Sequence, residues 1–215
     1  PKPLMPIGDM PILEVMLKQM KRAGVADVTL TVGHLANLLR TFFMDGRQWG
    51  MNISYSYEEK PLGTAGPLSL IHGLDSTFLV TNGDVLTTLD LRDLLAFHKA
   101  QGGIATIAVH KRRVRIDLGV VQWEENNRIA DYIEKPTYDY TVSMGIYVFE
   151  PQVMKFIPFN VYLDFPELVL KMIAAGEKVV GYAFDGYWMD LGRADDYSQA
   201  AEDFASMRSQ FLPEE

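Results

Sequence analysis

The sequence predicts an α/β protein with a three-layer α/β/α architecture: helices cover both faces of a mixed, mostly parallel central sheet that carries a small antiparallel extension. Two features of the chain predict this class. Helical and strand-like segments alternate through the first half, whereas short strand-like runs follow one another between residues 119 and 149. The 215 residues, of which 48% are apolar, suit a single domain spanning 1–215.

Helices are predicted where apolar residues recur at helical spacing, most clearly where a glycine follows. In residues 10–23, Ile12, Leu13 and Met16 share one face, and Gly24 ends the segment. The same pattern predicts helices at 35–43, 68–72, 91–101, 165–175 and 194–211.

Strands are predicted by short runs of β-branched and aromatic residues between turn signals. Residues 28–32, with the sequence Val-Thr-Leu-Thr-Val, are the first such run. The others are 53–57, 78–81, 105–109, 119–123, 129–134, 145–149 and 179–184.

The charge and composition exclude several classes of partner. A formal net charge of -8 argues against binding to nucleic acid or to an anionic membrane surface, because either needs a basic face. The chain has no cysteine, so it has neither a disulfide nor a thiolate metal site. No apolar run is long enough for a membrane span, and no signal peptide opens the sequence, so we expect a cytoplasmic protein.

Two aspartates from distant segments each follow an apolar strand. Asp84 lies in Asn82-Gly83-Asp84, directly after the run 78–81, and Asp190 lies in the segment 188–192. Open α/β sheets bind ligands at the carboxyl ends of their strands, and paired carboxylates there suit a divalent metal ion that serves phosphoryl chemistry. Asn-Gly-Asp is also ordinary turn chemistry, so a plain turn is the alternative interpretation.

Lys2 and a glycine loop are candidate contacts to a phosphate and to a planar ligand, respectively. Prolines on both sides fix the backbone of Lys2, which suits it to neutralise a phosphate, although a solvated terminal lysine is the simpler interpretation. In residues 59–66, Gly63, Thr64 and Ala65 allow a planar ligand to approach the backbone closely, and a plain connector is the alternative.

Candidate contacts to a sugar and a phosphate lie in the antiparallel region. Glu134 and Lys135 place a carboxylate and an ammonium side by side at a strand end, where an exposed ion pair is the alternative interpretation. Gly119 permits close backbone approach, but a β-bulge explains it equally well.

The order of these motifs is more specific than any one of them. Taken in order, the chain resembles the sugar-1-phosphate nucleotidyltransferases, and it looks closest to the mannose-1-phosphate guanylyltransferase-like branch, which includes members with CBS domains upstream. The resemblance runs from Pro1 to about Tyr197 and rests on these blocks: Pro1-Lys2-Pro3-Leu4-Met5-Pro6-Ile7, Pro11-Ile12-Leu13-Glu14, 59–66, Asn82-Gly83-Asp84, Gly119-Val120-Val121, Glu134-Lys135-Pro136, 142–147 and Trp188-Met189-Asp190-Leu191-Gly192.

The resemblance implies a Rossmann-like fold and a reaction. A nucleoside triphosphate, with GTP favoured, and a sugar 1-phosphate give a nucleotide-sugar and pyrophosphate. Asp84 and Asp190 would hold Mg²⁺, and Lys2 would stabilise charge on the triphosphate. Nucleotide contacts would come from Gly63, Thr64, Ala65 and Gly83, and sugar-phosphate contacts from Gly119, Glu134, Lys135 and Ser143.

Members of that family carry a strand and a Gly-rich, Arg-containing loop before the Pro-Lys-Pro segment, and this sequence starts after them. We therefore expect an N-terminally truncated domain that lacks a central strand between the segments at Val28 and Phe78 and has little transferase activity. A second possibility is that contacts in a homo-oligomer, or a rearrangement of the chain, fill that gap.

Two competing functions are kept open. A regulatory module that binds a sugar nucleotide without turnover is the main alternative to the enzyme. A metal-dependent glycosyltransferase ranks third, because those enzymes commonly use Asp-x-Asp at the strand end, whereas Asp84 is followed by Val85 and Leu86.

Overall fold

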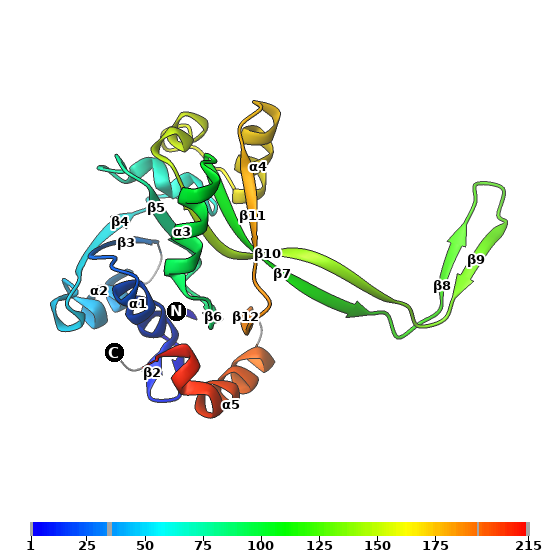
Figure 1. The fold of residues 1–215 in the computed structure, drawn as a ribbon, viewed down its shortest axis with the longest axis horizontal. Helices are drawn as coiled ribbons and strands as arrows, with labels where there is room; N and C mark the ends of the chain where they lie inside the picture. Colours follow the sequence, from blue (N-terminus) through cyan, green and yellow to red (C-terminus); the bar gives the residue numbers. More distant parts are fainter. Residues whose placement is uncertain (1, 34–35, 193, 214–215) are drawn as a thin grey trace.

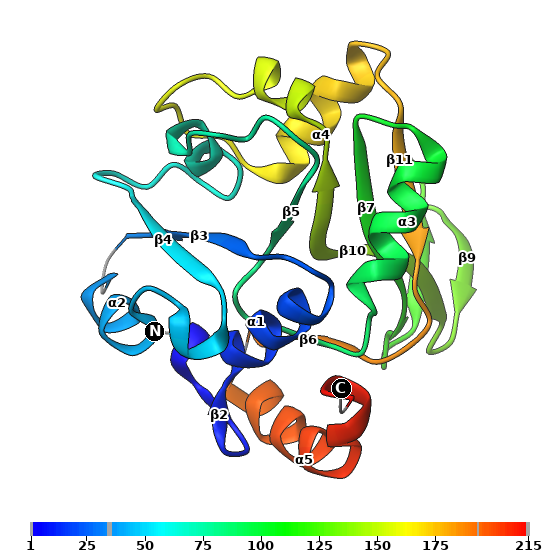
Figure 2. The same ribbon diagram turned by 60° about the vertical axis from the view of Figure 1, so that its left-hand side comes forward.

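The computed structural model describes residues 2–33, 36–192 and 194–213, and it has a layered body from which a long two-stranded ribbon projects (Figures 1 and 2). The α-helices are α1 (Ile12–Arg22), α2 (Ala36–Phe43), α3 (Leu91–Gln101), α4 (Phe165–Ala174) and α5 (Ala194–Phe211). The 3-10 helices are η1 (Lys2–Leu4), η2 (Arg47–Trp49), η3 (Gly66–Leu70) and η4 (Pro151–Phe156).

The strands form one larger sheet and several pairs. Their bounds are β1 (Pro6–Ile7), β2 (Met10–Pro11), β3 (Asp27–Val32), β4 (Asn52–Tyr57), β5 (Phe78–Thr81), β6 (Val85–Thr87), β7 (Ala105–Arg115), β8 (Val120–Trp123), β9 (Ile129–Ile133), β10 (Thr137–Phe149), β11 (Val179–Ala183) and β12 (Trp188–Asp190).

The central four-stranded sheet has the order β11-β7-β10-β5 and is mixed. The pair β7–β11 is parallel, whereas β10 runs antiparallel to both β5 and β7. The predicted α/β class and mixed sheet are confirmed. The parallel share is smaller than predicted, because β10 is inserted between two strands that run opposite to it.

Alternation along β10 divides the core into two layers. Ile146 and Val148 belong to a buried cluster with residues of α1, α2 and α3, whereas Tyr147 and Phe149 belong to a second cluster with α4. Since successive side chains of a strand point to opposite faces, the helices cover both faces of the sheet. This confirms the three-layer α/β/α architecture.

Two further strand pairs lie beside the central sheet. β3 pairs in parallel with β4, and β6 pairs in antiparallel fashion with β12. Within residues 2–33, 36–192 and 194–213, β3 pairs only with β4, and β5 pairs only with β10. The expected central strand between them stays a prediction.

Several element bounds differ from the predicted ones. The first helix begins at Ile12 rather than at residue 10, because Met10 and Pro11 pair with β1. The helix expected at 68–72 is the 3-10 helix η3, which has the same length but begins two residues earlier and has a proline near its start. The helix expected at 35–43 is α2, with Leu35 outside the described residues.

The largest difference is the length of β7 and β10. The predicted strands 105–109 and 145–149 extend to Arg115 and back to Thr137, and together they form the ribbon. Most of the added residues are exposed, and those of β7 are largely charged, so the extensions lack the apolar pattern that reveals a strand. Cross-strand pairing stabilises them instead, including a hydrogen bond of 3.0 Å from Arg113 Nε to Asp139 Oδ1.

We call residues 110–142 the arm. Figure 1 shows it extending from the body to the hairpin β8–β9 at its far end. Large apolar side chains on that hairpin are solvent-exposed, with Trp123 71% and Tyr132 61% exposed. Among the helices that the structure describes, none is long and apolar enough to cross a membrane.

Candidate functional site

The structure brings the two predicted aspartates to one place. Antiparallel pairing of β6 with β12 sets Asp190 opposite Val85, and the Leu191 amide donates a 3.0 Å hydrogen bond to the Asp84 carbonyl. Each aspartate therefore occupies the end of a short apolar strand, and the two strands are hydrogen-bonded neighbours. Segments about a hundred residues apart in the chain thus form one carboxylate pair.

Lys2 lies beside this pair. Its Nζ is 3.8 Å from Asp84 Oδ2 and donates a 3.3 Å hydrogen bond to the Gly192 carbonyl. The Pro3 ring packs over Gly83, where an added Cβ would lie 3.3 Å from Pro3 Cγ. The segment η1 therefore rests on the Asn82–Asp84 turn, and a side chain at residue 83 would require Pro3 to shift by a few tenths of an ångström. Pro1 lies outside the described residues.

The electrostatics of the pair favour a bound cation. Burial raises the pKa of Asp84 above its ordinary value, Asp190 raises it further, and Lys2 opposes both. The Asp84 side chain is 24% exposed, so solvent screens the repulsion only partly. A hydrogen bond with the backbone also lowers the pKa of Asp84, and a divalent cation would relieve the repulsion between the two carboxylates further.

The donor set suits Mg²⁺ held together with a ligand. Among the residues that the structure describes, no group of three or more His, Cys, Asp or Glu side chains is placed to hold a metal ion. Mg²⁺ is commonly bound by one or two carboxylates, with substrate phosphates and water completing its octahedron. Asp84 and Asp190 fit that mode and do not fit an all-protein metal cage.

A β-bulge in β10 contacts the Asn82–Asp84 turn through a backbone hydrogen bond. The register of β10 against β7 shifts between Ser143 and Tyr147. Within the bulge, Gly145 has a φ of +74°, and its carbonyl accepts a 2.9 Å hydrogen bond from the Asn82 amide. An added Cβ at Gly145 would lie 2.6 Å from Asn82 Nδ2, so only glycine fits without movement.

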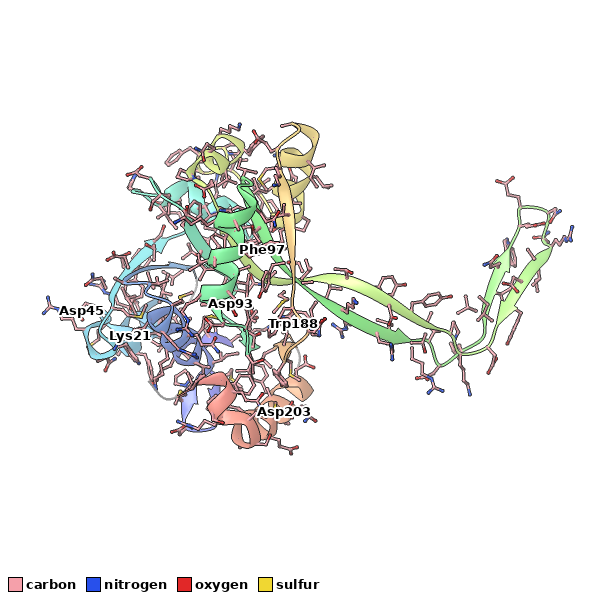
Figure 3. All side chains as sticks on the ribbon, in the orientation of Figure 1. Lys21, Asp45, Asp93, Phe97, Trp188 and Asp203 are labelled. Atoms are coloured by element: carbon pink, nitrogen blue, oxygen red, sulfur yellow. The ribbon has the colours of Figure 1, made fainter. Side chains whose placement is uncertain are left out.

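The bulge also joins β12 to the base of the arm. Trp188 Nε1 donates a 3.0 Å hydrogen bond to the Met144 carbonyl, and Figure 3 shows Trp188 near the point where the ribbon leaves the body. Ser143 serves the bulge itself, because its hydroxyl accepts from the Gly145 amide at 3.3 Å and donates to the Tyr147 hydroxyl at 3.1 Å. Ser143 is thus engaged within β10.

The predicted nucleotide loop is folded against the segment before α4. Gly63 has a φ of +77°, and an added Cβ would lie 2.7 Å from the Leu163 carbonyl oxygen. Ala65 is fully buried, and its amide donates to that same carbonyl at 2.9 Å. Close approach to a neighbouring chain segment therefore explains the glycine without a ligand.

Asp164 holds Thr64 in this loop. Its Oδ1 accepts hydrogen bonds from the Thr64 amide at 2.9 Å and from the Thr64 hydroxyl at 3.1 Å. The Thr64 hydroxyl in turn accepts from the Phe165 amide in the first turn of α4. The Tyr162 hydroxyl and these Thr64 donors lower the pKa of Asp164, because each stabilises the carboxylate.

Sequence reasoning missed Asp164 and Tyr162. An aspartate directly before Phe165-Pro166 matches the pattern of a helix N-cap, and Asp164 does take that backbone position. No signal in the sequence shows that its carboxylate contacts Thr64, a hundred residues earlier.

The arm carries the remaining predicted contacts away from the aspartates. Glu134 and Lys135 lie where the ribbon meets the hairpin, with 4.0 Å between Lys135 Nζ and Glu134 Oε1, and both side chains are largely exposed. Gly119 packs inside the hairpin, because an added Cβ would overlap the Tyr132 hydroxyl. Figure 1 shows this end of the arm well away from β6 and β12.

A cavity of about 310 Å³ lies elsewhere, between α1 and the end of α5. Its lining includes Lys21, Arg22 and Trp49 but neither aspartate. Gln19 closes one side by donating to the carbonyls of Thr87 and Phe211. The carboxylate pair, rather than this cavity, is the place where predicted functional groups converge.

A family model described as nucleotidyl transferase matches residues 1–207. The chain is 34% identical over 220 residues to a UTP–glucose-1-phosphate uridylyltransferase from Synechocystis sp., covering 93% of this chain and 57% of that protein. It is 33% identical over 210 residues to a mannose-1-phosphate guanyltransferase from Hypocrea jecorina, covering 92% of this chain and 56% of that protein. The chain therefore spans little more than half the length of the curated relatives it matches.

Solved structures show the same fold at lower identity. A Bacillus anthracis protein described as a glucose-1-phosphate thymidylyltransferase, in complex with sucrose, superposes with a TM-score of 0.76 at 20% identity, covering 98% of this chain and 89% of that one. HddC from Yersinia pseudotuberculosis, in complex with GMP-PN, gives a TM-score of 0.71 at 20% identity, covering 95% and 90%.

Proposed function

The chain belongs to the nucleotidyl transferase family, and on that premise we propose that it transfers a nucleoside monophosphate from a nucleoside triphosphate to a sugar 1-phosphate, releasing pyrophosphate. One observation carries the proposal: Lys2, Asp84 and Asp190 converge at the ends of two paired strands. Two carboxylates and one ammonium suit the handling of phosphates, which carry negative charge and need a cation beside them.

In the proposed reaction, a phosphate oxygen of the sugar 1-phosphate attacks the α-phosphorus, and pyrophosphate leaves from the opposite side. Asp84 and Asp190 are the residues that would hold Mg²⁺, which would supply positive charge to offset the negative charge of the phosphates. Lys2, beside Asp84, donates to phosphate oxygens and stabilises the charge that moves onto the pyrophosphate. The new phosphoanhydride bond replaces the one that breaks, so no protein nucleophile is required.

The direct test is pyrophosphate release. Residues 1–215 and any longer natural form of the protein are assayed with four nucleoside triphosphates and a panel of sugar 1-phosphates, with Mg²⁺ and with a chelator. We expect turnover with Mg²⁺ and none with the chelator. Turnover that survives complete chelation would overturn the role of the aspartates, and absence of any turnover would overturn the reaction.

Finer features are part of the same proposal. We propose GTP as the favoured triphosphate, because guanylyltransferases are among the relatives, and we propose a cytoplasmic location. We also propose weak turnover by residues 1–215 alone. Within the residues that the structure describes, Lys2 is the one cation within 4.0 Å of either aspartate, and a triphosphate needs more positive charge than that. Upstream CBS domains and a homo-oligomer are further proposals from the resemblance.

A second candidate is a regulatory module that binds a sugar nucleotide without turnover. The observation that favours it is the distance of the arm from the carboxylate pair, which separates the two halves of the proposed site (Figure 1). Calorimetry separates the candidates: the module binds the nucleotide-sugar but not the triphosphate, whereas the enzyme binds both.

We expect the arm to approach the carboxylate pair when both substrates bind, because the proposed transfer needs Lys135 near the sugar phosphate. The chain has no native cysteine, so Glu125→Cys on the hairpin and Ser198→Cys on α5 introduce two labelling sites. The distance between spin labels there should shorten when Mg²⁺ and both substrates are added.

A second pair of labelling sites, both in the body of the protein, controls for conformational changes that do not involve the arm. Ala96→Cys on α3, combined with Ser198→Cys, should give the same distance with and without substrates. An unchanged distance for the arm pair, in protein that is turning over, contradicts arm closure.

We expect Asp164→Ala to weaken triphosphate binding specifically. Loss of the carboxylate frees the Thr64 amide and hydroxyl, so the loop 63–65 loses its fixed shape. The KM for the triphosphate should rise about tenfold, since charge-assisted hydrogen bonds hold the loop, while the KM for the sugar phosphate stays unchanged. Glu167→Ala, one turn along α4 and ion-paired with Lys171, is the matched control. An equal rise in both KM values would assign Asp164 a general structural role.

A further inference from the structure

Tyr197 has a buried hydroxyl that makes no hydrogen bond with the part of the chain that the structure describes. It is the only buried side-chain nitrogen or oxygen atom that lacks a hydrogen bond within residues 2–33, 36–192 and 194–213. A buried donor without an acceptor is costly to the folded state, so such atoms are uncommon. When one lies beside a candidate site, a ligand that supplies the missing acceptor is the natural explanation.

The ring of Tyr197 lies beside the segments that carry the two carboxylates. It packs against the hydrophobic cluster that buries Leu86 and Leu191. Leu191 directly follows Asp190, and Leu86 lies two residues after Asp84. Both carboxylates act on the phenol, since each raises its pKa in addition to the larger effect of burial. The hydroxyl therefore keeps its proton and is a donor at neutral pH.

A neighbouring tyrosine shows that this part of the fold can satisfy a buried phenol. Tyr187 packs against the same cluster, and its hydroxyl donates a 2.8 Å hydrogen bond to Asp203 Oδ2. Figure 3 shows Asp203 on α5, the helix that also carries Tyr197. The cluster therefore does not in general leave tyrosine hydroxyls without a hydrogen bond, since Tyr187 has one and Tyr197 does not.

We propose that Tyr197 binds the substrate by donating a hydrogen bond to a phosphate oxygen held at Asp84 and Asp190. The proposal rests on the function proposed above. Neither carboxylate is hydrogen-bonded to the phenol, so the missing acceptor would have to come from a bound group. A negatively charged group held near two carboxylates would also need to share a cation with them. A phosphate oxygen does both, because it is an acceptor that also coordinates Mg²⁺.

Tyr197→Phe removes one oxygen atom and leaves the ring in place. We expect kcat/KM to fall by about tenfold or more, as for a lost hydrogen bond to a charged group, while the melting temperature of the ligand-free protein stays level or rises. Tyr187→Phe is the matched control. It breaks a hydrogen bond that is present in the free protein, so it should lower the melting temperature and leave kcat/KM nearly unchanged.

The outcomes separate this inference from the proposed function. If the wild type is active and Tyr197→Phe is equally active, the role of Tyr197 is overturned and the proposed function is not. The same holds if Tyr197→Phe has a lowered melting temperature. If wild type does not turn over but binds a nucleoside triphosphate with Mg²⁺ in calorimetry, the variant should bind it about tenfold more weakly, and equal binding overturns the role. Wild type that neither turns over nor binds contradicts both proposals.

Discussion

Asp84→Asn should reduce nucleotidyl transfer by about a thousandfold or more, since interactions that stabilise charge at the reacting phosphates contribute several kcal/mol to such reactions. The substitution keeps the size and the polarity of the side chain but removes half of the charge that the Asp84–Asp190 pair offers to a cation. The Leu191 hydrogen bond to the Asp84 backbone is unaffected, so the pairing of β6 with β12 should persist. Steady-state pyrophosphate release measures the loss, and residual activity above a tenth of wild type would contradict a metal-binding role.

The matched control is Asp185→Asn, an exposed carboxylate in the loop before β12, which should leave activity nearly unchanged.

The stability of Asp84→Asn should change in the opposite direction from its activity. The folded-state pKa of Asp84 is raised, so its ionised form destabilises the metal-free protein above that pKa. Asp84→Asn should therefore melt at a higher temperature than wild type at neutral pH in chelator. The gain should shrink as the pH falls through the raised pKa, because the wild-type carboxyl then takes up a proton. Added Mg²⁺ should stabilise wild type and not the variant.

Gly145→Ala should damage both the fold and the site. The backbone at residue 145 has a φ of +74°, which strains any side chain, and the new Cβ would meet Asn82 Nδ2 at 2.6 Å. We expect a stability loss of about 1–3 kcal/mol, which for a chain of this size lowers the melting temperature by several degrees. Movement of Asn82 also displaces Asp84, and a misplacement of about 1 Å near the chemistry can cost on the order of a hundredfold in rate.

Two comparisons isolate the contact with Asn82. Gly176→Ala has nearly the same backbone strain, with a φ of +76°, but its Cβ would meet no atom within 4 Å, so it should lose stability and keep activity. Adding Asn82→Gly to Gly145→Ala removes the clashing side chain and should restore part of the lost stability. If Gly145→Ala and Gly176→Ala behave alike, the bulge does not position the Asn82–Asp84 turn.

The parts of the fold that the sequence predicts are those whose side chains follow a burial pattern. Asp84 and Asp190 could be paired in advance because each follows an apolar strand, and strand ends converge at one edge of a sheet. The outer half of β7 could not be predicted as a strand, since Lys111, Arg112 and Arg113 are exposed and do not alternate between an apolar and a polar face.

Contacts between distant segments account for the rest of what was missed. Thr64 and Asp164 are each ordinary in their own neighbourhood, and only the folded chain brings their side chains together. The same holds for Tyr197, whose unmet hydroxyl is visible only when its surroundings are known. The direction of the arm is a tertiary property too, so the sequence placed Glu134 and Lys135 in one site with Asp84, whereas the structure holds them apart (Figure 1).

The inner and outer halves of β7 and β10 should differ in local stability. Inside the body, β7 and β10 are flanked by β11 and β5 and covered by buried side chains on both faces. Beyond the bulge, the same two strands pair only with each other and meet solvent, and an isolated pair of strands is marginal in water. The backbone amides of the arm should therefore exchange with solvent through local opening, while those a few residues away on the same strands exchange only when the whole body unfolds. We expect the boundary between the two cooperative units at the bulge around Gly145.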